Sequence, residues 1–367
     1  MPAVRGLAAW PGWAVAVAIL TLSRAFSIAV VVGAWALRVP PSPFTPWSAP
    51  FSMWDGQWYV WIAGHGYHAD AVVRTVYGPG YHDFAFFPAW PMLVRLVSLD
   101  GRLPLDAVAP ITANLLFLVG GVVIWTILDR VAGRANGLWG LALFAFSPGA
   151  FVFSIGYSEP LFLVVAALFF VAAERRLEGR AAILSGAAQL TRILGAALPF
   201  ALLADLLRRE TRRQALLVIG AAILAFAAWW TWIAILTGNP MGYMLGTPSW
   251  WLNQRPTPIP VGIASFFDRD QWTDWIALGL LVVTGVGTRW LVRRCELRLA
   301  LYALACIASC ALDTQTVMPR LLAIAFPAYV GFAAVLPSKW WRTGALAMFA
   351  GAQVAFGAAV TVRLIVP

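Results

Sequence analysis

Long apolar runs separated by short arginine clusters constrain the fold of this chain more than any other feature of its sequence. The runs from about Trp13 to Leu37 and from Asp106 to Val131 each exceed ~20 residues, the length that crosses the hydrocarbon core of a bilayer. The chain is 61% hydrophobic and only 11% charged, whereas a soluble domain carries about 25% charged residues. It lacks the polar residues needed to cover so large a core in water. The sequence therefore predicts an all-α, polytopic transmembrane protein.

The arginine clusters predict how these helices are oriented. The net charge is +10, and the basic residues lie mostly between apolar runs, as in Arg175-Arg176 and Arg208-Arg209. Under the positive-inside rule such loops face the cytoplasm, so the charge indicates topology and not a nucleic-acid partner. We predict a cytoplasmic N-terminus and, from the number of apolar runs, about ten or eleven membrane helices.

We expect a single domain, residues 1–367, with two longer segments on the extracytoplasmic side, residues 38–105 and 237–271. The first apolar run is too long for the core of a signal peptide, so we interpret it as a membrane helix. Cys295, Cys306 and Cys310 lie in or beside apolar runs without paired spacing. This pattern indicates neither a disulfide framework nor a zinc site.

One segment, Phe51–Pro91, concentrates polar groups that the rest of the chain lacks. It holds many aromatic residues, all three histidines and three of the acids: His65, His68, His82, Asp55, Asp70 and Asp83. Polar groups are costly in a membrane protein and are usually functional there. The segment is therefore most simply interpreted as building a site.

Aromatic side chains recur at helical spacing near the start of this segment, at i, i+4, i+7 and i+11: Trp54, Trp58, Trp61 and His65. A short helix with such a stripe on one face is typical of the membrane interface. Asp55 lies on the neighbouring face and has two interpretations. It can complete a capping box that begins at Ser52, or it can act as a general base towards a lipid-borne substrate.

Two groups of residues allow a metal site, but only weakly. His65, His68, His82 and Asp83 lack a specific ligand spacing, and hydrogen-bonded interfacial histidines are the favoured interpretation. Asp268 and Asp270 match the D-x-D pattern of metal-dependent nucleotide-sugar transferases, yet they lie in a polar loop and are interpreted as solvated. We predict no metal ion and no cofactor.

A second carboxylate, Glu159, is also open to two interpretations. Ser158-Glu159-Pro160 is typical of a helix start, where serine caps, glutamate favours the dipole and proline fits the first turn. Alternatively, Glu159 belongs to the site, with Tyr157 beside it as a substrate contact.

Three arginines lie within or at the edge of apolar runs: Arg24, Arg192 and Arg320. A charge at the centre of a membrane helix costs at least about 2.5–3.5 kcal/mol, so each should meet a partner. The partner is either an internal acid, for instance Asp313 or Glu159, or a substrate phosphate, which a guanidinium binds bidentately. All three arginines are candidate phosphate ligands.

Residues 181–207 have arginines at both ends yet are only about one span long. Two short helices meeting near residues 189–195 would explain this and place Arg192 deep in the protein, where non-helical backbone is tolerated if protein buries it. This topology brings the Phe51–Pro91 segment, Glu159, Arg192 and Arg320 to the extracytoplasmic face.

Several motifs resemble those of the PIG-V family, the GPI mannosyltransferase 2 enzymes and their bacterial relatives. The first extracytoplasmic segment carries Trp54-Asp55-Gly56, Ile62-Ala63, His65-Gly66-Tyr67 and Phe84-Ala85-Phe86-Phe87-Pro88. Later motifs follow in the same order: Ser147-Pro148, Phe153, Gly156-Tyr157-Ser158-Glu159-Pro160-Leu161-Phe162, Thr191-Arg192-Ile193-Leu194-Gly195, Arg320-Leu321 and Phe326-Pro327. The likeness covers most of the chain, with one departure: Trp58 stands where eukaryotic members carry histidine.

The resemblance implies a GT-C glycosyltransferase fold and an inverting transfer of mannose from polyprenyl-phosphate-mannose, with an α-linked product. It implies Asp55 as the catalytic base, with a site lined by Trp54, His65, Tyr157, Glu159, Arg192 and Arg320. The alanine-rich composition, with arginine in place of lysine, is typical of a bacterial plasma-membrane protein from a GC-rich genome. We therefore expect a lipid-linked glycan or a protein hydroxyl as acceptor, and not a GPI precursor. Alternatives are transfer of another sugar, protein O-mannosylation and a non-enzymatic flippase of lipid-linked sugars.

Overall fold

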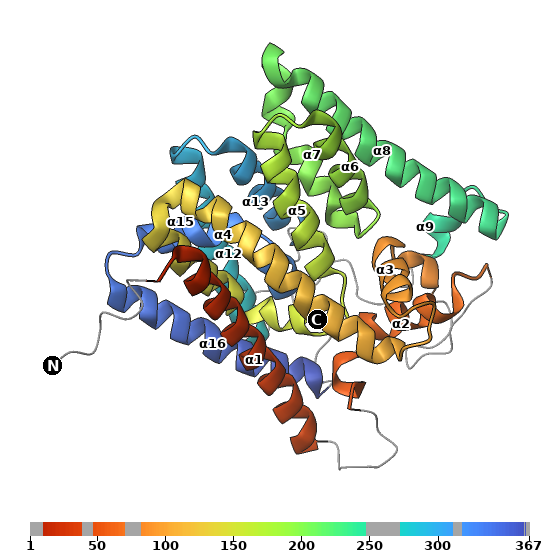
Figure 1. Ribbon diagram of the computed structural model, residues 1–367, viewed down its shortest axis with the longest axis horizontal. Coiled ribbons are helices and arrows are strands. Elements are labelled where there is room, and N and C mark those ends of the chain that lie inside the picture. The colour runs from red at the N-terminus through yellow and green to blue at the C-terminus, as the bar shows by residue number, and fades with distance from the viewer. Residues whose placement is uncertain are drawn as a thin grey trace.

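Helices account for all regular structure in the computed structural model, which describes residues 10–38, 47–69, 82–246, 272–310, 318–362 and 364 (Figure 1). These residues form no β-strand. The α-helices are α1 (Gly12–Arg38), α2 (Asp55–His65), α3 (Ala89–Val97), α4 (Leu105–Ala145), α5 (Glu159–Glu174), α6 (Glu178–Gln189), α7 (Ala197–Ala201), α8 (Arg209–Thr237), α9 (Gly242–Gly246), α12 (Trp272–Arg293), α13 (Leu297–Ser309), α14 (Met318–Ala323), α15 (Phe326–Val335) and α16 (Lys339–Thr361). Five 3-10 helices join them: η1 (Ala49–Phe51), η2 (Asp83–Ala85), η3 (Pro148–Ser154), η4 (Ile193–Ala196) and η5 (Leu203–Leu207).

Five of the described helices are long and apolar enough to cross a membrane: α1, α4, α8, α12 and α16. The bent pair of η3 and α5 makes a sixth if it is counted as one span. The remaining apolar runs form shorter helices, at Ile193–Leu207, Leu297–Ser309 and Phe326–Val335. The protein is thus the expected all-α, multi-pass membrane protein. The sequence predicts ten or eleven membrane helices because each apolar run is counted as one helix. Among the described residues, several of these runs form helices that are too short or too bent to cross a membrane alone.

α4 contains a sharp break at Gly133, just after the predicted end of a span at Val131. Gly133 has φ 76° and ψ 161°, outside the helical region, and a glycine adopts such a positive φ at little cost. The chain folds back so tightly that a Cβ on Gly137 would lie 2.9 Å from the backbone nitrogen of Asp129. The predicted end of a span near Val131 is confirmed.

The second half of α4 ends before the apolar run that contains it does, because that run continues to Phe153. α4 stops at Ala145, and residues 148–154 form η3, which lies at 101° to α5. Pro148 begins this turn because its ring cannot continue the preceding helix. The bend places the first residue of α5, Glu159, inside the protein.

The helices pack around α4, which contacts α1, α5 and α15 extensively. α1 also lies along α16, so helices near the two ends of the chain are neighbours (Figure 1). α12 and α15 approach closely where glycines meet: a Cβ on Gly287 would lie 1.8 Å from the carbonyl oxygen of Ala328. α8 is covered mainly by α6 and by residues of the α2–α3 segment.

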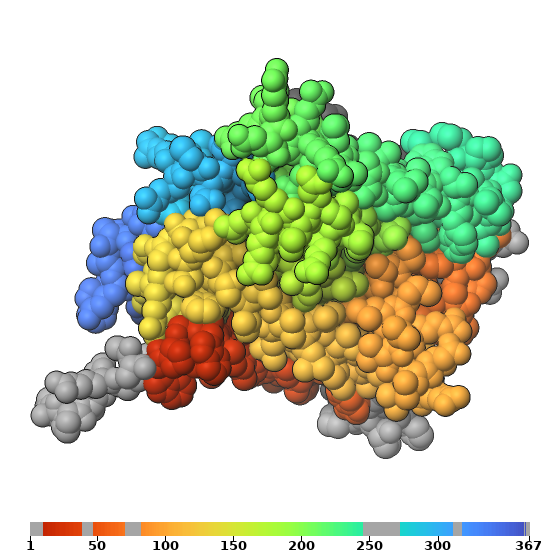
Figure 2. Space-filling model, turned by 45° about the horizontal axis from the view of Figure 1, so that its top comes forward, coloured from red at the N-terminus to blue at the C-terminus, as the bar shows by residue number. Residues whose placement is uncertain are grey.

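The α2–α3 segment forms a small aromatic layer of its own, and the end of α8 lies against it (Figure 2). The prediction that the aromatic stripe of α2 faces the membrane interface is wrong for Trp58, which is buried and stacks on Phe86 at 5.6 Å. Trp61 is partly exposed and stacks on His65. Trp58 is buried because α2 packs against α3 and α4.

Candidate active site

Four charged side chains from distant parts of the sequence meet near the start of α2. Arg320 of α14 lies between two carboxylates, donating from Nη1 to Oδ2 of Asp55 at 2.5 Å and from Nε to Oε1 of Glu159. Arg192 lies on the other side of Glu159, with Nη1 2.7 Å from the same Oε1. We call Asp55, Glu159, Arg192 and Arg320 the charged cluster.

Burial explains why the charged cluster must be paired. The side chain of Glu159 is fully buried, and those of Arg192 and Arg320 are 11% and 8% exposed. A buried ion is stable only with a close counter-charge and hydrogen bonds. The predicted internal salt bridge to Glu159 is thus confirmed for both arginines. Within the charged cluster two carboxylates balance two guanidinium groups.

Asp55 is the most accessible member of the charged cluster, with 23% of its side chain exposed. It is the first residue of α2, but its carboxylate bonds Arg320. The capping-box interpretation is wrong for Ser52, whose hydroxyl donates to the backbone carbonyl of Asp106. The N-cap is Trp54, which makes no side-chain cap hydrogen bond.

Trp54 holds the start of α2 in a strained conformation. Its φ of 53° and ψ of −123° lie in a region that residues other than glycine rarely adopt. Such an outlier costs about 1–3 kcal/mol and occurs most often at functional sites. The Trp54 indole donates to the carbonyl of Val360 in α16 at 3.2 Å, which anchors the residue next to Asp55.

Glu159 begins α5, as the sequence predicts, but Ser158 does not cap the helix with its side chain. Instead the Ser158 hydroxyl lies 3.0 Å from the hydroxyl of Tyr59. Burial, together with the carboxylates of Asp55 and Glu159, raises the pKa of Tyr59 above its usual range. The phenol therefore stays protonated beside the charged cluster.

Arg192 enters the site from a break between helices. α6 ends at Gln189, and Arg192 has extended backbone before η4 begins, which confirms the predicted meeting of two short helices. Its Nε makes no hydrogen bond within the described residues. Tyr157 completes the site, with its ring 4.5 Å from the guanidinium carbon of Arg320.

Two predicted site residues lie away from the charged cluster. His65 is at the far end of α2, about 15 Å along the helix from Asp55, and its Nδ1 lies 3.1 Å from the carbonyl oxygen of Trp61, which accepts the hydrogen bond. Arg24 is buried in α1 and donates to the carbonyls of Ala145 and Ala150 and to the Ser154 hydroxyl. Its guanidinium also lies 4.0 Å from the ring centre of Phe117.

His65 and His68 make hydrogen bonds, whereas the buried Nδ1 of His82 has no partner among the described residues. His68 bonds Asp83 through its Nδ1 and its backbone N–H. Burial raises the pKa of Asp83, although the bonds from His68 oppose this shift. The described residues contain no group of three His, Cys, Asp or Glu placed to hold a metal ion. Asp70, Asp268, Asp270 and Asp313 lie outside the described residues.

Sequence reasoning missed the role of Ser158 and the link from Trp54 to Val360. The contact of Ser158 with Tyr59 could not be predicted because the sequence around Ser158 is that of an ordinary helix cap. The hydrogen bond from Trp54 to Val360 could not be predicted because any residue can supply a backbone carbonyl. Tyr59 could have been found from its place on the same face of α2 as Asp55.

Comparison with solved structures finds proteins of similar fold, whereas comparison of sequences finds no relative. Neither a scan of protein-family models nor a search of curated proteins finds a match. Among solved structures, the oligosaccharyltransferase of Archaeoglobus fulgidus in complex with Zn and sulfate matches with a TM-score of 0.50 and 14% identity, over 94% of this chain and 53% of that one. The same enzyme tethered to an acceptor peptide with an NVT sequon gives a TM-score of 0.50 and 13% identity, over 95% and 55%.

This chain therefore spans about half the length of the structures that it matches. At such low identity the likeness concerns the fold alone. The protein shares the fold of about half of the Archaeoglobus fulgidus oligosaccharyltransferase, and the charged cluster is built into that fold.

Proposed function

We propose that this protein is a membrane glycosyltransferase that moves a sugar from a polyprenyl-phosphate carrier to a hydroxyl acceptor. The observation that carries the proposal is the Asp55–Arg320–Glu159 link in a GT-C fold. It joins a partly exposed carboxylate, suited to removing a proton, to a guanidinium, suited to binding a phosphate.

Asp55 acts as the general base. It takes the proton of the acceptor hydroxyl while that oxygen attacks the anomeric carbon of the sugar. The bond from this carbon to the phosphate oxygen breaks, and the phosphate leaves with the electron pair. Attack from the opposite face inverts the configuration, so a β-linked donor gives an α-linked product.

Arg192 and Arg320 bind the departing phosphate, whose negative charge grows as the bond breaks. Arg192 has an Nε donor without a partner in the described chain, and Arg320 is the shared cation of the charged cluster. A phosphate that reaches Arg320 competes with Asp55 for its Nη1. Oδ2 of Asp55 is then released to accept a proton, so the base becomes available when the donor is bound.

The donor sugar is mannose and the site is extracytoplasmic, as the PIG-V resemblance implies. Either a lipid-linked glycan or a protein hydroxyl is the acceptor. The peptide-bound state of the Archaeoglobus fulgidus oligosaccharyltransferase supports including peptide acceptors. The identity of the donor sugar and the identity of the acceptor are proposed independently. The first is tested by comparing donors, and the second by comparing acceptors.

The test is transfer by purified protein in lipid nanodiscs. Labelled polyprenyl-phosphate-mannose is incubated with membrane lipids or serine- and threonine-containing peptides, in parallel with the glucose and pentose donors. We expect transfer of mannose and a loss of about 10²–10⁴-fold in kcat for Asp55→Asn. Asp100→Asn, an exposed aspartate in the turn after α3, is the matched control and keeps wild-type turnover.

Near-normal turnover of Asp55→Asn would remove Asp55 from the mechanism. Transfer of glucose or pentose in place of mannose would correct the donor and keep the enzyme class. Movement of the lipid-linked sugar across the bilayer without transfer would establish the flippase alternative.

A further inference from the structure

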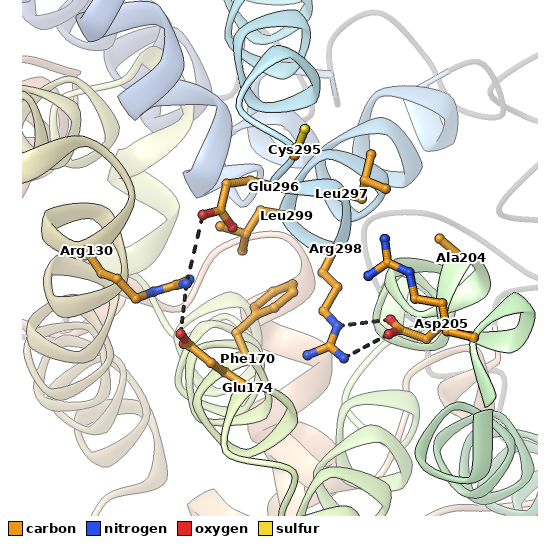
Figure 3. A pocket seen from close by; sticks show the side chains of 11 residues that line it. Arg130, Phe170, Glu174, Ala204, Asp205, Cys295, Glu296, Leu297, Arg298 and Leu299 are labelled. Carbon is orange, nitrogen blue, oxygen red and sulfur yellow. Dashed lines mark hydrogen bonds and ion pairs between the residues drawn. The ribbon is translucent and has the colours of Figure 1, made fainter. Parts of the chain in front are cut away.

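A polar pocket of about 190 Å³ lies where α5 ends (Figure 3), whereas Glu159 of the charged cluster is the first residue of α5. α4, α5 and η5, the residue after η5, the α12–α13 turn and α13 contribute its walls. The lining residues are Arg130, Phe170, Glu174, Ala204, Asp205, Arg208, Cys295, Glu296, Leu297, Arg298 and Leu299. None of them takes part in the proposed sugar transfer.

The carboxylates of the pocket already have partners. Asp205 accepts two hydrogen bonds of 2.9 Å from Arg298, and Glu174 pairs with Arg130 at 2.8 Å (Figure 3). Glu296 lies 3.9 Å from the same Nη1 of Arg130. The lining thus holds three carboxylates and three arginines, and Arg208 is the one of these arginines that makes no ion pair within the described part of the chain.

Exposed arginines adjoin two of the lining residues in the sequence. Arg175 and Arg176 follow Glu174, and Arg293 and Arg294 precede Cys295. Only Arg176 of these four has an acidic partner among the described residues, Glu210 at 3.5 Å. An anion approaching the pocket therefore meets exposed arginines beside the lining residues and, within the lining, the Arg208 guanidinium, which makes no ion pair among the described residues.

Exposed apolar side chains continue from the pocket along the outside of the protein. Leu207, next to Arg208, is 90% exposed, and Leu203 and Leu297 are also exposed. The pocket lies where α8 begins and where α12 ends, which is the depth of lipid head groups if these helices span the bilayer. Exposed leucines beside a cation fit a ligand that carries both a phosphate and hydrocarbon chains.

We propose that this pocket binds the head group of an anionic phospholipid. Arg208 holds the phosphodiester, and the acyl chains lie along Leu203 and Leu207, while Arg298 stays bonded to Asp205 and to the carbonyl of Ala173. Basic pockets between membrane helices bind anionic lipids in this way. A free phosphate would use the cations but leave the leucines without a role.

Cys295 supplies the readout because it lines the pocket and is exposed, whereas Cys306 and Cys310 are buried. Its rate of alkylation by a maleimide is measured in nanodiscs of phosphatidylcholine with and without phosphatidylglycerol. We expect phosphatidylglycerol to slow alkylation of the wild-type protein. Arg208→Gln should weaken this protection about fivefold in lipid concentration, the effect of one arginine at an anionic surface.

Arg212→Gln is the matched control. This exposed arginine lies one turn further along α8, outside the pocket lining, and its removal should leave the protection unchanged. Protection that is the same in wild type and Arg208→Gln would overturn the proposal, as would a wild-type protein that phosphatidylglycerol does not protect. Equal protection by inorganic phosphate or by soluble glycerophosphoglycerol would overturn the lipid as ligand and leave a free-phosphate site.

Discussion

Glu159 is the residue on which the charged cluster depends. One oxygen, Oε1, faces both Arg192 and Arg320, while Oε2 has no hydrogen bond within the described residues. Because its side chain is fully buried, its charge is compensated by the two guanidinium groups and not by water. Removing that charge leaves two cations close together with only Asp55 to balance them.

Glu159→Gln should therefore destabilise the protein by about 3–5 kcal/mol, the usual loss when one partner of a buried ion pair is removed. Thermal unfolding in detergent measures this. Glu210→Gln is the control, since the Arg176–Glu210 pair is exposed and such pairs contribute only about 0–1 kcal/mol. Equal losses for the two variants would show that Glu159 is not an important counter-ion.

A second prediction distinguishes the structural role of Arg24 from the phosphate-binding role proposed for Arg192. Arg24 bonds backbone carbonyls and Ser154, so Arg24→Gln should lower the unfolding temperature while the KM for donor is unchanged. Arg192→Gln should raise that KM about tenfold or more, because a charge-assisted bond to phosphate is worth about 1.5–3 kcal/mol. Donor titrations on folded protein give both values. A raised KM for the donor in Arg24→Gln would contradict this prediction and show that Arg24 contributes to phosphate binding.

At the scale of elements, the α12–α15 pair depends on two glycines. Gly287 and Gly331 face each other so closely that a Cβ on Gly331 would lie 2.3 Å from the carbonyl oxygen of Gly287. Small residues allow membrane helices to approach in this way. The atoms in contact are backbone, so they cannot move aside as a flexible side chain could.

Gly287→Ala should destabilise the protein by about 1–3 kcal/mol, the usual cost of overpacking. Gly285→Ala lies two residues away on α12 with no atom within 4 Å of its added Cβ, and should leave stability unchanged or slightly higher. The unfolding temperatures of the two variants are compared in the same detergent. An unchanged temperature for Gly287→Ala would mean that the two helices can separate without loss.

At this scale, the positions at which helices break were predicted best from the sequence. The breaks after Val131 and after Gln189 follow from arginines at both ends of an apolar run, a local signal. The turn into η3 was missed because the residues up to Phe153 stay apolar, and hydropathy does not distinguish an α-helix from a 3-10 turn. For Arg320 the sequence named Glu159 and Asp313 as possible acidic partners and did not name Asp55, since partners so far apart share no sequence pattern.

At the scale of the whole molecule, ionic groups gather at both ends of α5. The charged cluster lies where α2 and α5 begin, and the arginine-rich pocket lies where α5 and α12 end. The positive-inside rule assigns the pocket end to the cytoplasm. The orientation of the active site follows from this assignment and is a prediction.

Alkylation of single cysteines tests the orientation. Cys295 should react with a membrane-impermeant maleimide in inside-out vesicles and be protected in right-side-out vesicles. Asp100→Cys, made in a Cys295→Ser background, should react in the opposite pair of conditions, because Asp100 lies in the exposed turn between α3 and α4. Reaction of both sites from the same side would contradict the predicted topology.

The long separation between partners in the charged cluster has a consequence for biosynthesis. Asp55 and Arg320 are 265 residues apart, and the anchor from Trp54 to Val360 spans 306 residues. At a synthesis rate of about 5–20 residues per second, α2 is made well before α14 and α16 exist. Asp55 then has neither its guanidinium partner nor the anchored turn that precedes it. On the proposed function, a chain interrupted before α14 would lack a complete active site, which forms only as translation is nearly finished.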